Sequence, residues 1–213
     1  TEALSLVAER LGWDQETMMP PAAADQRGEE IAALEGVLHA RRTDPRIADW
    51  LDRAAPRDDV ARAQLRLIRR SHTRNAKVPA RLAQDIARQT STAQGVWAEC
   101  RAKDDVATFL PVLAEVLRLK REEAACLTEC GDLYDALLDD YEPGATAVSV
   151  AAMFDRMRPR LVALRAAILG SGREPAGLAG SFAKDAQLAL ARTVASAYGY
   201  DWCQNGKGRL CEA

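Results

Sequence analysis

The helical spacing of apolar residues is the feature that most constrains what this chain can fold into. Such residues recur every three or four positions in segment after segment. In the first segment they are Leu4, Val7, Ala8 and Leu11. Prolines and glycines separate the segments, and no run alternates apolar and polar residues between turns, as a half-buried strand would. We therefore predict an all-α fold, an irregular multi-helix array without a fixed-period repeat.

The stop signals divide the chain into three parts. We predict an N-terminal helical region at residues 1–169, a glycine-rich loop at 170–180, and a final helix with a polar tail at 181–213. These parts are expected to form one domain that is truncated, because the chain begins at Thr1 inside a helical pattern. The expected helices cover residues 22–40, 80–103, 105–129, 133–140, 149–169 and 182–197, with short helices after Pro45 and after Asp58 or Asp59.

Composition excludes several classes of partner. The 213 residues are 48% hydrophobic and 28% charged, with a net charge of -2. This balance gives no electrostatic basis for binding nucleic acid or an anionic membrane. No apolar run reaches the roughly 20 residues that span a bilayer. The cysteines are odd in number, so we expect free thiols in a reducing cytoplasm; they are Cys100, Cys126, Cys130, Cys203 and Cys211.

No catalytic or metal-binding residue can be assigned from motifs. The histidines are His39 and His72, and neither belongs to a His-Glu-x-x-His pair. Cys126 and Cys130 share a helix face and could bind a soft metal, but packing cysteines are the more ordinary interpretation. There is no serine elbow of the Gly-x-Ser-x-Gly kind and no phosphate-binding loop.

The segment 11–21 concentrates unusual chemistry where one helix ends and the next begins. Trp13 offers a large apolar surface and one N–H that needs a partner if it is buried. Two interpretations are open: Trp13 anchors the core at a helix end, or Asp14, Gln15 and Glu16 line a cleft. We predict that Trp13 is largely buried and that at least one of these polar neighbours faces a cleft.

A second candidate segment contains Tyr134, Asp135 and Tyr141, together with other aspartates. Asp135 and Asp139 are four residues apart on a short helix, where like charges repel unless a basic group or solvent compensates. Solvated surface acids are the ordinary alternative to an acid–base pair.

Four stretches in order resemble the Taq-type metallocarboxypeptidases. Residues 11–20 resemble the early Trp-Asp-x-x-Thr-x-Met-Pro signature of that family, and residues 29–34 fit the helix that follows. Residues 134–146 (Tyr-Asp-Ala-Leu-Leu-Asp-Asp-Tyr-Glu-Pro-Gly-Ala-Thr) resemble a recurring family motif. Residues 198–202 with 208–210 resemble its Gly-Tyr-Asp and Gly-Arg-Leu passage, although Cys211 stands where the family has aspartate.

The resemblance implies a helical, cytoplasmic, homodimeric enzyme that removes C-terminal amino acids from peptides with zinc or cobalt. The family's zinc ligands and general base belong to a His-Glu-x-x-His helix and a downstream glutamate, all beyond the Gly-Arg-Leu passage. None maps onto a residue of this chain. The chain is then expected to form one half of a grooved metallopeptidase fold, with substrate-groove candidates Trp13, Asp14, Gln15, Glu16, Tyr134, Asp135 and Tyr141. The competing interpretation is a non-enzymatic helical scaffold or interaction module derived from that fold.

Overall fold

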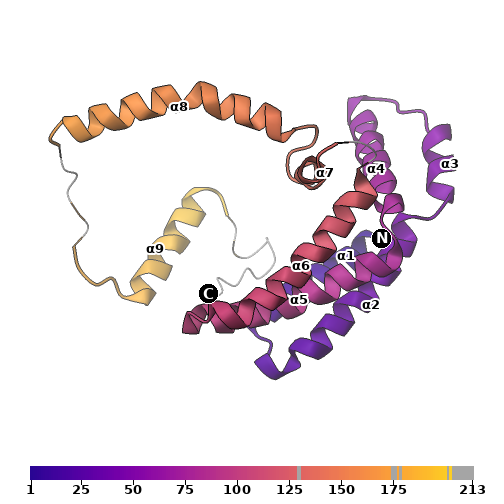
Figure 1. Cartoon of the computed structure of the whole chain (residues 1–213), viewed down its shortest axis with the longest axis horizontal. Helices are drawn as coiled ribbons and strands as arrows, with labels where there is room; N and C mark the ends of the chain where they lie inside the picture. The colour runs from indigo at the N-terminus through magenta and orange to yellow at the C-terminus, as the bar shows by residue number, and fades with distance from the viewer. Residues whose placement is uncertain (129–130, 174–176, 178, 201, 203–213) are drawn as a thin grey trace. The chain divides into compact units, whose positions relative to one another are not determined.

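The computed structural model describes residues 1–128, 131–173, 177, 179–200 and 202, and within them it is all-α, without strands (Figure 1). A 3-10 turn, η1 (Pro21–Ala23), precedes the second helix. The α-helices are α1 (Glu2–Thr17), α2 (Ala24–Arg42), α3 (Arg46–Arg53), α4 (Asp59–Lys77), α5 (Ala80–Lys103), α6 (Val106–Leu127), α7 (Leu133–Leu138), α8 (Ala147–Gly170) and α9 (Lys184–Ala197). The predicted fold class is confirmed.

The chain separates into two compact units, Thr1–Ala151 and Ala152–Ala213. The division predicted from sequence at 169 and 180 stays a prediction. In the part of the chain that the structure describes, no helix has the length and apolar character needed to cross a membrane.

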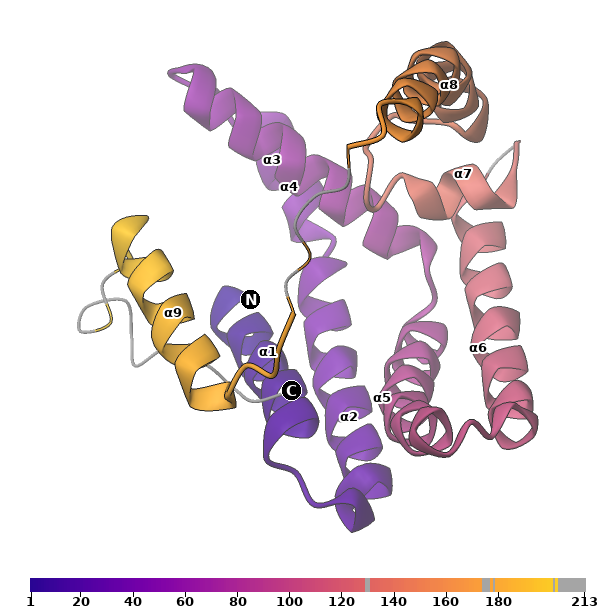
Figure 2. The ribbon, with the colours of Figure 1, turned by 90° about the vertical axis from the view of Figure 1, so that its left-hand side faces the viewer.

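The first unit is built on the packing of α2 along α5, with α5 lying between α2 and α6 (Figure 2). Small residues allow the close approach of α2 and α5. A Cβ atom added at Gly36 would lie 2.5 Å from Gln84 Nε2, and one added at Gly28 would lie 3.1 Å from Thr92 Oγ1. Next to this contact, Val78, Leu82 and Leu119 form a buried cluster that ties the start of α5 to α6.

Side-chain caps fix where several helices start. Asp58 accepts a hydrogen bond from Ala61 N at 2.7 Å, and Asp105 accepts one from Thr108 N at 3.1 Å. The sequence predicted that Ser149 begins α8, which is wrong. Thr146 Oγ1 accepts from Ser149 N at 3.1 Å while Ser149 Oγ accepts from Thr146 N at 2.9 Å, so the reciprocal cap starts the helix earlier.

Trp13 does not anchor the core, and its predicted burial is wrong. α1 continues through it to Thr17, and the indole is 43% exposed. The inner side of α1, which includes Leu4, Ala8 and Leu11, is partly buried, and α1 packs against α2. Because each residue turns a helix by about 100°, Trp13 lies on the opposite side from Leu11.

Candidate functional site

The segment from α7 to the start of α8 is organised by aspartates. Asp132 caps α7 by accepting from Tyr134 N at 2.8 Å. Asp135 Oδ1 accepts from Ala147 N at 2.6 Å, which satisfies an N–H group in the first turn of α8. Asp139 Oδ1 accepts from Gly144 N at 2.9 Å, and Gly144 has a positive φ of 83°, a backbone conformation that suits glycine. The turn between α7 and α8 is therefore held from both ends.

Two arginines of α4 hold this segment in place. Arg70 Nη2 lies 2.6 Å from Asp139 Oδ2 and also donates to the Asp139 carbonyl. Arg74 Nη1 lies 3.3 Å from Asp139 Oδ2, its Nε lies 2.8 Å from Asp140 Oδ1, and its Nη2 donates to the Ala136 carbonyl at 3.0 Å. We call this set the arginine clamp: Arg70, Arg74, Asp139 and Asp140.

The clamp also sets the charge state of Asp139. The Gly144 N–H and then the Arg70 and Arg74 guanidinium groups lower the pKa of the Asp139 carboxyl below its ordinary value, although burial opposes the shift. Asp139 therefore stays ionised at neutral pH. The repulsion expected between Asp135 and Asp139 is offset by bound arginines and backbone N–H groups rather than by solvent alone.

A cleft of about 460 Å³ lies beside the clamp, between α4, the end of α6 and α7. Both basic and acidic groups line it. Its lining residues include Thr73, Arg74, Lys77, Thr128, Asp132, Asp135, Asp139 and Thr146. Asp135, a sequence-predicted groove residue, is among them. Tyr134 and Tyr141 are not; their side chains are 61% and 83% exposed on the same segment. The arrangement offers a polar cleft with two solvent-facing phenol rings nearby.

Two of the other predicted groove residues, Asp14 and Gln15, make structural contacts within the helix array. Asp14 pairs with Arg27 of α2 at 2.6 Å, and Arg27 also donates to the Leu11 carbonyl at 2.6 Å. Gln15 Nε2 donates to the Ser91 carbonyl at 2.8 Å, while Ser91 Oγ donates back to Gln15 Oε1 at 2.7 Å. Glu16 is exposed. The polar residues of α1 thus fasten it to α2 and α5, and the structure does not bring them to the α7 cleft (Figure 2).

Neither histidine is arranged as a metal ligand. His39 is buried, and its Nε2 lies 2.7 Å from the Val78 carbonyl; His72 Nδ1 lies 2.9 Å from the Arg42 carbonyl. A carbonyl can only accept, so these nitrogens donate N–H. Among the described residues, no three His, Cys, Asp or Glu side chains form a group that could hold a metal ion. The described residues therefore do not fit a zinc site; Cys130 lies outside them.

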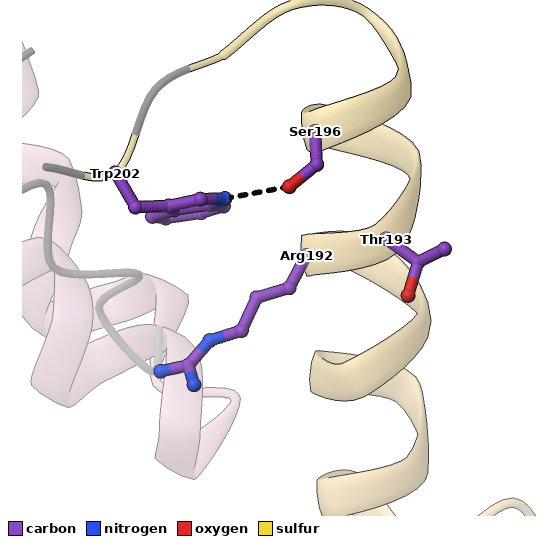
Figure 3. Close-up of a pocket in the computed structure, with 4 residues that line it drawn as sticks. All are labelled: Arg192, Thr193, Ser196 and Trp202. Carbon is purple, nitrogen blue, oxygen red and sulfur yellow. Dashed lines mark hydrogen bonds between the residues drawn. The ribbon is translucent and has the colours of Figure 1, made fainter.

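A second pocket, of about 650 Å³, lies at the end of α9 and contains the tryptophan of the Gly-Tyr-Asp segment (Figure 3). Trp202 Nε1 donates to Ser196 Oγ at 3.0 Å, and the Arg192 guanidinium lies 6.0 Å from the centre of the Trp202 ring. Tyr200 packs edge-on against Trp202 with ring centres 4.6 Å apart. Asp201, the Gly-Arg-Leu passage and Cys211 lie outside the described residues.

Sequence reasoning missed Arg70 and Arg74, the residues that hold the predicted motif. The sequence contained one indication of them, because two arginines four positions apart share one face of α4. This spacing does not identify the acidic partners, since Arg74 and Asp139 are 65 positions apart along the chain.

Comparisons with known proteins agree over almost the whole chain. Residues 1–212 match the sequence model of the family described as carboxypeptidase Taq (M32) metallopeptidase. Thermostable carboxypeptidase 1 of Thermus thermophilus is 36% identical over 94% of this chain and 43% of its own length. The chain spans less than half the length of that relative.

Solved structures agree with this match. Trypanosoma cruzi metallocarboxypeptidase 1 is 30% identical, with a TM-score of 0.71 over 94% of this chain and 42% of that one. A structure described as BsuCP is 23% identical, with a TM-score of 0.85 over 93% of this chain and 41% of that one, which shows the shared fold.

Proposed function

Because the chain belongs to the carboxypeptidase Taq (M32) family of metallopeptidases, we propose that it is the N-terminal helical part of an enzyme that releases C-terminal amino acids from peptides. The observation that carries this proposal is the family match over residues 1–212, which includes all the motifs singled out in the sequence. The relatives are named as carboxypeptidases, and we extend that activity to the complete protein.

In that enzyme the α7 cleft forms part of one wall of the substrate groove. The support is its polar lining, the ionised Asp139 held by the arginine clamp, and the exposed rings of Tyr134 and Tyr141 on the same short segment. A rigid wall positions a peptide and excludes water from the reacting bond. The Trp13–Glu16 segment contributes indirectly, because Asp14 and Gln15 fix α1 to the array.

The catalytic metal, zinc or cobalt, is held by residues outside these 213. Both histidines of the chain are engaged by backbone carbonyls, which supports this proposal. We further propose that the 213-residue chain alone hydrolyses no peptide bond, and that the complete enzyme is a cytoplasmic homodimer that binds neither nucleic acid nor membrane.

The alternative is a non-enzymatic helical scaffold or interaction module derived from the same fold. The large exposed apolar side chains of α8 favour it, since such patches are common at protein interfaces. The reading frame beyond residue 213 separates the two: a His-Glu-x-x-His helix supports the enzyme, and a stop codon supports the module.

The direct assay uses the complete product of the gene and an amino-terminally blocked dipeptide. We expect release of the C-terminal amino acid, loss of release after treatment with a metal chelator, and recovery on adding zinc or cobalt. The 213-residue chain alone should give no release and retain no stoichiometric zinc after dialysis. A complete product that releases nothing in the presence of either metal contradicts the enzymatic proposal.

A further inference from the structure

The two histidines of the chain form a reciprocal contact between α2 and α4. His39 lies near the end of α2, and its Nε2 donates to the carbonyl of Val78, the C-cap residue of α4, at 2.7 Å. His72 lies near the end of α4, and its Nδ1 donates to the carbonyl of Arg42, the last residue of α2, at 2.9 Å. Carbonyl groups at the end of a helix have no partner within that helix. Each histidine therefore satisfies the end of the other helix, and we call these four residues the histidine bracket.

Both hydrogen bonds of the histidine bracket form within the compact unit Thr1–Ala151. His39 and Val78 are buried there. Because a neutral imidazole carries one N–H, each bond also fixes which ring nitrogen holds the proton. Removing a donor from a buried carbonyl is more unfavourable than losing an exposed hydrogen bond, because water does not replace it. The bracket is therefore a directional attachment of α4 to α2.

α4 carries the histidine bracket and the arginine clamp on opposite sides. His72 is two positions from Arg70 and two from Arg74, and two residues turn a helix by about 200°. His72 accordingly reaches α2, while the two arginines bind Asp139 in the turn between α7 and α8. The helix array is thus connected to that turn through α4, by polar contacts on both of its sides.

We propose that His39 and His72 are positioning residues for the substrate groove, acting through α4 and the arginine clamp. Without the bracket, the end of α4 loses both histidine hydrogen bonds to α2. Arg74 is then held less firmly, and so are Asp139 and Asp140, which it binds. This role rests on the proposed function, because the wall that the clamp holds is the groove wall of the proposed carboxypeptidase.

Pairs of variants of similar volume separate the hydrogen bonds from the packing. His39→Gln and His72→Asn keep an amide N–H close to the ring nitrogen that donates, whereas His39→Met and His72→Leu have no donor. The control is Cys100→Ala, which truncates a buried side chain at the opposite end of α5 from Val78 and lowers stability away from the bracket. Circular dichroism checks the helical content of each variant.

Hydrogen exchange in the complete protein, read by mass spectrometry over residues 140–150, tests the hold on the turn. Within this segment the N–H groups of Gly144 and Ala147 donate to Asp139 and Asp135. The two variants without a donor should exchange here at least about threefold faster than the parent, and the Gln, Asn and Cys100→Ala variants should stay within about twofold. Unchanged exchange in both variants without a donor overturns the inference.

Steady-state kinetics on an amino-terminally blocked dipeptide separates positioning from a merely structural role. Poorer positioning of the bound substrate should raise KM at least about threefold in the two variants without a donor, with kcat within about twofold, and the Gln and Asn variants should restore KM. A merely structural role lowers the amount of active enzyme, so the apparent kcat falls while KM stays at the parent value; that result overturns the inference. A complete protein that releases no amino acid contradicts the proposed function, while faster exchange over residues 140–150 still supports the hold of the histidines on the turn.

Discussion

Arg74 and Asp139 join α4 to the α7–α8 turn across 65 positions of sequence, with Arg74 Nη1 3.3 Å from Asp139 Oδ2. The two side chains are only 19% and 31% exposed. Arg74 also reaches Asp140 and the Ala136 carbonyl, so one guanidinium group fixes three points of the motif. The position of the proposed groove wall therefore depends on Arg74 together with Arg70, which also binds Asp139.

Replacing Arg74→Ala should lower the free energy of unfolding by about 1–3 kcal/mol, because it leaves partly buried acceptors without a charged donor. Urea denaturation measures the change. The control is Arg62→Ala, which removes an exposed ion pair with Asp59 and should cost less than about 0.5 kcal/mol. Equal midpoints for the Arg74→Ala variant and the parent would show that the clamp does not stabilise the fold.

The clamp also predicts a dependence of stability on pH. The folded-state pKa of Asp139 is lowered, so the unfolded chain binds its proton more readily. This contribution is complete above the unfolded pKa of about 4 and is lost as the pH falls through the folded pKa. Asp139→Asn should therefore reduce the loss of stability seen when unfolding is measured from pH 5 downwards. If the free energy of unfolding falls with pH at the same slope in Asp139→Asn and in the parent, Asp139 does not have a lowered pKa in the folded chain.

The reciprocal hydrogen bonds between Gln15 and Ser91 predict that the Gln15 amide, rather than the Trp13 indole, fastens α1 to α5. Gln15→Ala should lower the free energy of unfolding by about 1–2 kcal/mol, because it removes the amide that hydrogen-bonds to both the carbonyl and the hydroxyl of the largely buried Ser91. A double-mutant cycle with Ser91→Ala should give a coupling energy of about 1 kcal/mol. Glu16→Ala, one position away and exposed, serves as the control and should stay within about 0.5 kcal/mol. If the losses of unfolding free energy caused by Gln15→Ala and Ser91→Ala simply add, the hydrogen bonds between these two residues contribute little.

The course of the helices follows from local sequence, whereas the partners of the polar residues do not. Apolar spacing together with residues such as Asp58, Asp105 and Gly144 is enough to predict helices and turns, because these signals act over a few positions. Gln15 was one of three neighbouring candidates for a cleft, and its hydrogen bond to Ser91, 76 positions away, was not part of that prediction. Such a pairing arises only once α1 packs beside α5, so no local pattern contains it.

The same reason explains the error at Trp13 and the contacts that were not foreseen at the acidic motif. A large aromatic residue predicts burial on average, but the side of the helix on which it lies decides the outcome. For Asp139 the local sequence showed only a repulsion with Asp135; the compensating arginines come from α4, in a distant part of the chain. The candidate site was therefore located by its motif, while the contacts that build it required the structure.

A chimaera tests most directly whether this chain supplies the N-terminal part of a carboxypeptidase. The chain replaces the matching segment of Thermus thermophilus thermostable carboxypeptidase 1, to which it is 36% identical. Release of the C-terminal amino acid from an amino-terminally blocked dipeptide is then measured beside the unmodified thermostable enzyme. We expect release within about tenfold of that enzyme, a difference of about 1.4 kcal/mol in the activation barrier. A chimaera that is helical and retains the metal of the thermostable enzyme, yet releases no amino acid, would contradict it.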